Sequence, residues 1–405
     1  MEPTEQTMID GGAAGEWPGL EGLVYLDCHA TTPIDPRVVA AMMPFLTQHF
    51  GNAGSDHAFG WAAQAAVDRA RAAIAVAINA SPEEIVFTSG ATEANNLAIK
   101  GVAEAYLNKG RHLITVATEH SAVLDPCRYL QSLGFEVTVL PVDAWGLLDL
   151  AELARSIRPD TVLVSVMLAN NEIGLLQPIA QIGQLCRDRG VLFHTDAAQA
   201  IGKVPIDVQA MKIDLMSLTA HKVYGPKGIG ALYVRRADPR VNLSPQLHGG
   251  GQERGRRAGT LFVPQIVGFG RAIELAGAEM AAESVRMAAL RDRLWSYFDP
   301  ARSGLTVHLN GHPTQRLPGN LNLTIEGLNP TDVLKAVQAI AAVSSGSACQ
   351  SGTGKPSHVL QAIGRSPGPK STALRFGLGR FHTEAVIDQV GQDILRALQR
   401  LADKT

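Results

Sequence analysis

The stretches TVLVSVML (161–168), PIAQIGQLCRDRG (178–190) and VLFHTD (191–196) follow one another closely and decide the fold class. The first and last are short, apolar and rich in β-branched residues, which is typical of strands buried on both faces. The middle stretch has a helical pattern and ends at a glycine, a common helix stop. A strand, a helix and a second strand in succession predict a parallel βαβ unit.

The same alternation continues on both sides of this unit. Further strands are predicted at EIVFTS (84–89), HLITVAT (112–118), EVTVLPV (136–142), DLMSLT (214–219) and GALYVRR (230–236). Helical patterns occupy EANNLAIKGVAEAYLNKG (93–110) and HSAVLDPCRYLQSLG (120–134). The sequence therefore predicts an α/β protein with a largely parallel sheet and helices on both of its faces.

The pattern changes after about residue 275. A long helix over about 269–298 leads to the strand NLNLTIE (320–326), a Ser/Gly-rich loop and a closing helix from about 383. We predict four parts: a flexible arm (1–22), a segment that packs on the small domain (23–35), a large domain (36–275) and a small α+β domain (276–405).

Composition excludes several classes of protein. Of the 405 residues, 46% are hydrophobic and 18% charged, as in an ordinary globular protein, and 36 Lys and Arg against 38 Asp and Glu give no basic field for nucleic acid. No apolar run approaches the ~18 residues of a membrane span, and the N-terminus does not resemble a secretory signal. We therefore expect a soluble, cytoplasmic protein.

The four cysteines, at positions 28, 127, 186 and 349, form no CxxC pair and no dense framework. A disulfide scaffold and a metal site are therefore not expected. Cys186 lies in a helical pattern, whereas Cys349 lies among Ser, Gly and Thr in VSSGSACQSGTGKPSHVL (343–360). That setting favours an exposed, reactive thiol at Cys349.

Three further segments place polar residues where predicted strands end, the edge at which parallel sheets bind ligands. TSGATEANNLAI (88–99) offers helix N–H groups to an anion, although it also resembles an ordinary capping box. Asp196 could face a cationic ligand group or cap a following helix. Lys222, before a Gly-rich turn, could form a Schiff base or be a solvated surface residue.

Other motifs have weaker support. Gly364-Arg-Ser366-Pro-Gly368 matches a nucleophile-elbow pattern and His248-Gly-Gly-Gly251 an oxyanion segment, but a helical stretch precedes Ser366 and prolines follow it. His308 and His312 stand among Asn, Gly and Pro residues that oppose a helical metal pair. The basic stretch GQERGRRAGT (251–260) is either a solvated loop or an anion contact.

Ten motifs, in order, resemble the pyridoxal-phosphate-dependent cysteine desulfurases of the class V aminotransferase group. They are LDCHATTPIDPRV (26–38), GNAGSDHAFG (51–60), FTSGATEANNLAIKG (87–101), TEHSAVL (118–124), NNEIG (170–174), TDAAQAIGK (195–203), TAHKVYGPKGIG (219–230), HGGGQERGRRAGT (248–260), SSGSACQSG (344–352) and LRFGLGRF (374–381). The resemblance implies an aspartate-aminotransferase-like fold (fold type I), a pyridoxal 5'-phosphate cofactor and a homodimer with active sites at the subunit interface.

The resemblance also implies roles for individual residues. Lys222 matches the lysine that bonds to the cofactor, Asp196 the carboxylate that keeps the ring nitrogen protonated, and His120 the residue that stacks on the ring and moves protons. Asn171 and Gln199 match residues near the ring hydroxyl, and Asn171 also matches a residue at the substrate. The residues that match the phosphate site are Ala91, Thr92, Thr219 and His221, together with Thr260, which matches a contact to the phosphate of the second subunit. Arg375 matches the residue that binds the substrate carboxylate, and Cys349 matches the nucleophile.

The implied reaction converts L-cysteine to L-alanine. The substrate displaces Lys222, the freed amine removes the Cα proton, and the Cys349 thiolate attacks the substrate sulfur and retains it as a persulfide. A protein acceptor, such as an iron–sulfur scaffold, would then take the sulfur. The sequence departs from the usual pattern at Cys28, where Tyr or Asn is common, and in the cysteine loop at Gln350 and Lys355.

Alternative functions stay open from the residues alone. A related pyridoxal-phosphate lyase or aminotransferase, or a selenocysteine lyase, would use the same site without a persulfide relay. A serine hydrolase would use Ser366, and a non-catalytic interaction protein would keep the fold alone.

Overall fold

The computed structural model describes residues 22–345, 356–365 and 368–404. Residues 1–21 of the predicted flexible arm lie outside these ranges. Cys349 and Ser366 also lie outside them, so their predicted roles stay predictions.

The larger sheet of the described residues has seven strands in the order β2-β8-β7-β6-β5-β3-β4. Their bounds are β2 Ile85–Thr88, β3 His112–Val116, β4 Glu136–Leu140, β5 Thr161–Ser165, β6 Leu192–Asp196, β7 Leu215–Thr219 and β8 Gly230–Val234. Neighbours from β4 to β7 are parallel, whereas β8 is antiparallel to both β7 and β2. Each predicted apolar run contains one of these strands, and the expected mainly parallel sheet is confirmed.

Strand β8 is antiparallel because only a short turn separates it from β7. Residues 220–229 contain no helix in the structure, and parallel neighbours need a crossover of a dozen or more residues. Thr88 at the end of β2 and Thr219 at the end of β7 both pair with Gly230. The carboxyl ends of β2 and β7 therefore lie at the same edge of the sheet.

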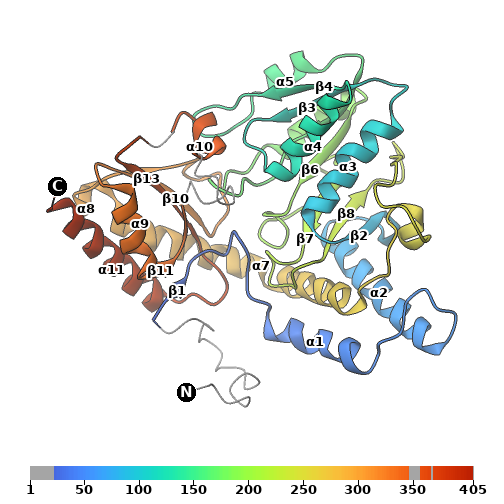
Figure 1. The fold of residues 1–405 in the computed structure, drawn as a ribbon, viewed down its shortest axis with the longest axis horizontal. Coiled ribbons are helices and arrows are strands. Elements are labelled where there is room, and N and C mark those ends of the chain that lie inside the picture. The colour runs from blue at the N-terminus through green and yellow to red at the C-terminus, as the bar shows by residue number, and fades with distance from the viewer. Residues whose placement is uncertain (1–21, 346–355, 366–367, 405) are drawn as a thin grey trace.

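Helices cover both faces of this sheet (Figure 1). Their bounds are α1 Pro36–Thr47, α2 Ala58–Ala77, α3 Ala91–Ala105, α4 Ser121–Ser132, α5 Leu150–Ser156, α6 Ile179–Asp188 and α7 Val263–Phe298. Successive strand residues enter different cores: Val86 packs with α3 and α4, and Phe87 packs with α2, α6 and the first half of α7. This alternation is the period-2 geometry of a strand buried on both sides.

A second sheet of the described residues has the order β12-β13-β10-β9 and is antiparallel throughout. Its strands are β9 Thr306–Leu309, β10 Asn320–Glu326, β12 Ser344–Ser345 and β13 Ser371–Gly377. The helices of this part are α8 Pro300–Ser303, α9 Pro330–Gln338, α10 His358–Ala362 and α11 Glu384–Ala402. Two short strands lie outside the sheet, β1 Val24–Tyr25 and β11 Ala341–Ala342. The predicted strand NLNLTIE is β10. Strand β1 pairs with β11, so the segment after the N-terminal arm joins this part of the molecule.

Helix α7 connects the two parts (Figure 1). Buried residues of its first half, such as Phe269, belong to the core beneath the large sheet, and Leu294 and Phe298 near its end belong to the core of the second sheet. The helix begins at Val263, earlier than the predicted 269, and the predicted domain boundary at 275/276 falls inside it. The four-part division remains a proposal. Among the described residues, no helix is both long and apolar enough to cross a membrane.

Candidate active site

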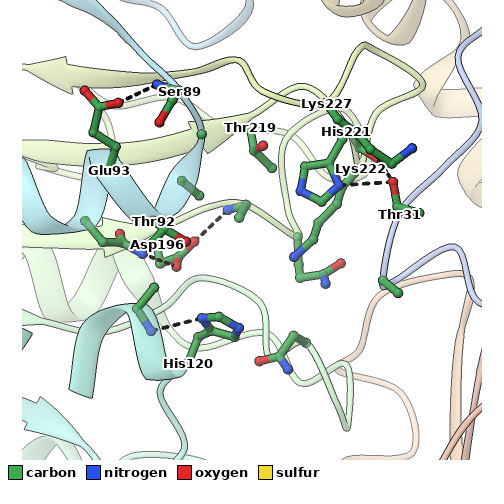
Figure 2. Close-up of a pocket in the computed structure, with 18 of the residues that line it drawn as sticks. Thr31, Ser89, Thr92, Glu93, His120, Asp196, Thr219, His221, Lys222 and Lys227 are labelled. Atoms are coloured by element: carbon green, nitrogen blue, oxygen red, sulfur yellow. Dashed lines mark hydrogen bonds between the residues drawn. The ribbon is translucent and has the colours of Figure 1, made fainter. Parts of the chain in front are cut away.

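A cavity of about 480 Å³ opens at the carboxyl edge of the large sheet. It lies where β2, β6 and β7 end and where α3 and α4 begin (Figure 2). Nine residues singled out in the sequence line it: Ala91, Thr92, His120, Asn171, Asp196, Gln199, Thr219, His221 and Lys222. Segments separated by up to 131 positions, from Ala91 to Lys222, therefore meet as the parallel-sheet rule predicts.

One wall of the cavity is the start of α3. The helix follows Gly90, whose φ of 153° requires a glycine, and its first residues Ala91 and Thr92 face the cavity. The Glu93 carboxylate accepts a hydrogen bond from the Ser89 N–H at 2.8 Å, but the cap residue of α3 is Gly90, which has no side chain to form a capping box. The capping-box interpretation is therefore wrong for this turn, and the N–H groups of the first helical turn, beside Ala91 and Thr92, stay available to an anion in the cavity.

Asp196 is a buried carboxylate with two fixed hydrogen bonds. The Asn95 side chain donates to Oδ2 at 2.7 Å, and the Ala198 N–H donates to Oδ1 at 2.8 Å (Figure 2). No α-helix follows Asp196, so the helix-cap alternative is wrong for this residue. A carboxylate held at the bottom of a cavity suits a cationic ligand group.

His120 caps α4 and faces the cavity. Its Nδ1 accepts a hydrogen bond from the Ala122 N–H at 3.1 Å, so a neutral ring carries its proton on Nε2. Burial, assisted by the nearby charges of Lys222 and His358, lowers the pKa of His120 although Asp196 opposes that shift. A neutral imidazole is therefore favoured in the cavity.

The turn that carries Lys222 is held by the N-terminal segment. Thr32 donates its hydroxyl to the His221 carbonyl at 3.0 Å and accepts the Tyr224 N–H at 2.9 Å, and Thr31 bonds the His221 ring at 3.2 Å. Burial, with the charge of Lys222, lowers the pKa of His221 to about 4. Lys222 extends into the cavity toward the space between Asp196 and His120 (Figure 2). The solvated-surface alternative for Lys222 is thus wrong.

Asn171 and Gln199 lie at the other side of the cavity. Gln199 is fixed from behind because its Nε2 donates to the His29 carbonyl at 2.8 Å and its Oε1 lies 3.1 Å from His29 Nδ1. The Asn171 Oδ1 is buried and has no hydrogen-bond partner among the described residues. A buried amide oxygen without a partner is costly, which fits a ligand group at this position.

Two predicted site residues do not line the cavity. Arg375, on β13, donates to the Asn171 carbonyl at 2.8 Å and to Asp27 Oδ1 at 2.9 Å, so it is joined to the cavity through Asn171. Thr260 is exposed and is not among the residues that line the cavity. The nearby Arg257 forms an ion pair with Glu93 at 2.8 Å, so part of the basic 251–260 stretch is structural in this chain and does not face the cavity.

Several lining residues were missed from the sequence. They are Ala30, Thr31, Ser89, Glu93, Ala122, Met167, Ala198, Lys227, Gly228 and Asn95. Asn95 stands within a quoted motif, and its position one turn after Ala91 on α3 places it over Asp196, a signal that was available. The N-terminal residues gave no comparable signal.

Two of the cysteines lie inside the molecule. Cys127 and Cys186 are buried in helices α4 and α6, as expected, and burial raises the pKa of Cys127 to about 12. Within the described ranges, no group of three or more His, Cys, Asp or Glu side chains is placed to hold a metal ion.

Comparisons with known proteins agree with this geometry. The profile of the Aminotransferase class-V family matches residues 24–390. The chain is 56% identical over 366 residues, 90% of either chain, to the protein named cysteine desulfurase IscS of Methylococcus capsulatus. A solved NifS-like protein superposes with a TM-score of 0.86 at 36% identity, covering 94% of this chain and all of that one.

A second solved structure, described as SspA in complex with cysteine, has a TM-score of 0.76 and 39% identity over 88% of this chain and 98% of its own. The family match spans most of the chain, and the similarity to the relatives extends over the same region. The chain belongs to the class V aminotransferase family, in the group that contains the cysteine desulfurases.

Proposed function

We propose that this protein is a cysteine desulfurase that uses pyridoxal 5'-phosphate, converts L-cysteine to L-alanine and retains the sulfur as a persulfide on Cys349. The observation that carries the proposal is the meeting of Lys222, Asp196 and His120 around one cavity above the start of α3. The 56% identity to a protein named cysteine desulfurase supports the choice of substrate within the family.

The residues of the cavity fit this cofactor. The first turn of α3, with Thr219 and His221, would hold the phosphate, because helix N–H groups and hydroxyls suit an anion. Asp196 would pair with the protonated ring nitrogen, and Asn171 Oδ1 would gain the partner that it lacks. Bound pyridoxal phosphate supplies an electron sink for a carbanion at the substrate Cα.

The chain's own residues then perform the proton transfers and the sulfur transfer. The Lys222 amine accepts the Cα proton, and neutral His120, with Nδ1 occupied by the Ala122 N–H, offers the Nε2 proton to a group in the cavity. Arg375 is proposed for the substrate carboxylate from the family resemblance; in this structure its guanidinium holds the Asn171 carbonyl and Asp27 beside the cavity, and a carboxylate could take a place in that bonding pattern.

The sulfur step balances without an external oxidant. The Cys349 thiolate forms a bond to the substrate sulfur while the carbon–sulfur bond breaks, and the carbon keeps that electron pair and is protonated to give alanine. The persulfide would pass to a protein acceptor, and an iron–sulfur scaffold is the acceptor that the family resemblance implies.

We also propose a homodimer in which Thr260 serves the cofactor phosphate of the second subunit. Large apolar side chains are exposed on α1, after it and at the start of α2, among them Met43, Phe50, Phe59 and Trp61, at 46%, 71%, 57% and 61%. Such a group of exposed side chains is typical of a subunit contact. Sedimentation of the wild type and of Trp61→Glu should show a dimer and a weakened dimer, respectively.

The central test loads purified protein with cysteine. Wild type should absorb as a pyridoxal-phosphate protein, release alanine and gain 32 Da on Cys349 by peptide mass spectrometry, a mass change that is roughly one sulfur atom. Cys349→Ser should keep the absorbance and lose both alanine release and the added mass. Full-rate sulfide release by Cys349→Ser would refute the nucleophile, and faster turnover of selenocysteine without a persulfide would favour the lyase alternative.

A further inference from the structure

The side chain of Gln199 is held by residues that lie outside the main cavity. Its Nε2 donates to the His29 carbonyl at 2.8 Å, and its Oε1 lies 3.1 Å from His29 Nδ1 and 3.3 Å from Lys203 Nζ. Gln199 lines the cavity, whereas His29 and Lys203 are not among the lining residues. None of the roles proposed above uses the His29 imidazole.

These contacts determine which end of the Gln199 amide faces which neighbour. A backbone carbonyl can only accept a hydrogen bond, so the amide nitrogen faces the His29 carbonyl and the amide oxygen faces His29 Nδ1 and Lys203 Nζ. Among the described residues, the second N–H of this amide has no partner. The group that Gln199 has left for a ligand in the cavity is therefore a donor.

The orientation of the amide in turn determines the tautomer of His29. Burial, with the charges of Lys203 and Arg375, lowers the pKa of His29 well below 6.5, so the ring is neutral near pH 7. A proton on Nδ1 bonds to Gln199 Oε1 and leaves Nε2 as a buried acceptor without a partner among the described residues. A proton on Nε2 would leave that N–H unpaired and would also turn two acceptors, Nδ1 and Oε1, toward each other. The tautomer with the proton on Nδ1 is therefore favoured.

The second sheet holds His29 in place behind Gln199. Gly377, at the end of β13, lies against it, since a Cβ at position 377 would stand 2.7 Å from the His29 backbone nitrogen and 3.0 Å from its ring Cδ2. The Cys28 N–H donates to the Gly377 carbonyl at 3.0 Å, and the Gly377 N–H donates to the Leu26 carbonyl at 2.7 Å. The imidazole therefore contacts Gln199 from a backbone that is itself fixed.

We propose that His29 is a positioning residue, whose Nδ1–H and carbonyl group together hold the Gln199 amide so that it presents an N–H, and not its oxygen, to the cavity. The ligand atom beside Gln199 must then be an acceptor. The inference rests on the proposed function in identifying that atom as the ring oxygen of pyridoxal phosphate, which the family resemblance puts near Gln199. A fixed donor favours a cofactor that has this oxygen over one that lacks it.

Two cofactor analogues and two substitutions of nearly equal shape test the proposal. In equilibrium dialysis of cofactor-free protein, the ratio of the dissociation constants of 3-deoxypyridoxal phosphate and pyridoxal phosphate measures recognition of the ring oxygen. His29→Asn keeps an N–H near the place of Nδ1, and His29→Leu has almost the same shape without it. We expect the ratio to stay near wild type in His29→Asn and to fall roughly fivefold in His29→Leu, as for the loss of one neutral hydrogen bond.

Gln199→Leu is the control for this experiment. Without the amide, the ratio should fall at least as far as in His29→Leu, and adding His29→Leu to Gln199→Leu should change it no further. An unchanged ratio in His29→Leu would overturn the proposal. An equal fall in His29→Asn and His29→Leu would overturn it as well, because the ring would then act through its volume and not through its N–H.

The tautomer of His29 gives a second test that needs no cofactor. In nuclear magnetic resonance spectra of cofactor-free protein with isotope-labelled histidine, the His29 signal is the one that His29→Asn removes. Its ring-nitrogen shifts should show a neutral ring with the proton on Nδ1 at pH 7. A proton on Nε2, or a charged ring, contradicts the proposal even if His29→Leu does not fold. Neither measurement uses cysteine, so a protein that passes both tests and releases no alanine would refute the proposed reaction and not this inference.

Discussion

The contact between Asn95 and Asp196 should control both stability and cofactor retention. Asn95 is fully buried on α3, and its Nδ2 donates to Asp196 Oδ2 at 2.7 Å, while its own Oδ1 has no partner among the described residues. In Asn95→Ala the Asp196 carboxylate keeps, of its partners among the described residues, the Ala198 N–H. The whole effect of the amide therefore passes through one charge-assisted hydrogen bond.

The expected magnitude follows from that bond. A hydrogen bond to a charged group contributes about 1.5–3 kcal/mol, so Asn95→Ala should lower the free energy of unfolding of cofactor-free protein by roughly that amount at pH 7. If the looser Asp196 also pairs less well with a ring nitrogen, a loss of about 1.4 kcal/mol in binding weakens cofactor affinity about tenfold. Urea unfolding at fixed protein concentration and equilibrium dialysis of the cofactor measure the two quantities.

Asn96→Ala is the matched control for this experiment. Asn96 is the next residue on the same helix, and its side chain donates to the Thr92 carbonyl at 3.0 Å, on the exposed side. We expect it to change stability by less than about 0.5 kcal/mol. If Asn95→Ala and Asn96→Ala gave equal stability and equal cofactor affinity, the assignment of Asp196 as a held, functional carboxylate would be wrong.

Three further predictions concern the support of the site. Gly230→Ala should abolish tight cofactor binding, because its Cβ would stand 2.4 Å from the Leu218 carbonyl oxygen on β7 and 2.7 Å from the backbone of Gly90, at the start of α3. Gly277→Ala is the control: its Cβ would have nothing within 4 Å, so this variant should bind the cofactor normally in the same dialysis assay. Arg71→Met alone should cost about 3–5 kcal/mol in urea unfolding, since it leaves the buried Glu253 carboxylate unpaired, and the double variant with Glu253→Leu should recover much of that loss. Burial lowers the pKa of the His194 imidazole from 6.5 to about 4, so between these pH values the unfolded chain binds a proton that the folded chain does not. The free energy of unfolding should therefore fall by up to ~3 kcal/mol as the pH is lowered from 6.5 to 4. His194→Gln should reduce the dependence of that free energy on pH by one proton, and an unchanged dependence would contradict the buried, neutral ring.

The sequence identified most of the cavity because parallel strands end at one edge of a sheet. Strands at 191–196 and 214–219 predict that Asp196 and Lys222 lie at the same edge of the sheet, and the structure adds that the two strands are neighbours. The antiparallel direction of β8 is less evident, since it depends on the absence of a crossover in ten residues rather than on any pattern within the strand.

The contributions of the N-terminal segment could not be predicted in the same way. Thr31 and Thr32 reach the Lys222 turn across about 190 positions, through hydrogen bonds to the His221 carbonyl. Nothing in the local composition of ATTP distinguishes this contact from an ordinary loop.

The turn 170–173 explains why the two sheets must meet for the site to exist. Asn170 Oδ1 accepts the N–H groups of Glu172 and Ile173, which closes the turn and leaves its carbonyl groups directed outward. Side chains of the second sheet satisfy those carbonyls: Asn320 and Asn322 on β10 donate to the Glu172 carbonyl at 3.1 and 3.0 Å.

Arg375 on β13 completes the arrangement by donating to the Asn171 carbonyl at 2.8 Å. The second sheet therefore orients the backbone that presents the Asn171 side chain to the cavity of the first. Buried carbonyl groups without partners are costly. If the sheets separated, the carbonyl groups of this turn would lose their partners, and the turn would move and displace the Asn171 side chain at the same time. Correct placement of Asn171 and docking of the second sheet are thus the same structural event, and a site that needs Asn171 forms only when both parts of the chain are folded.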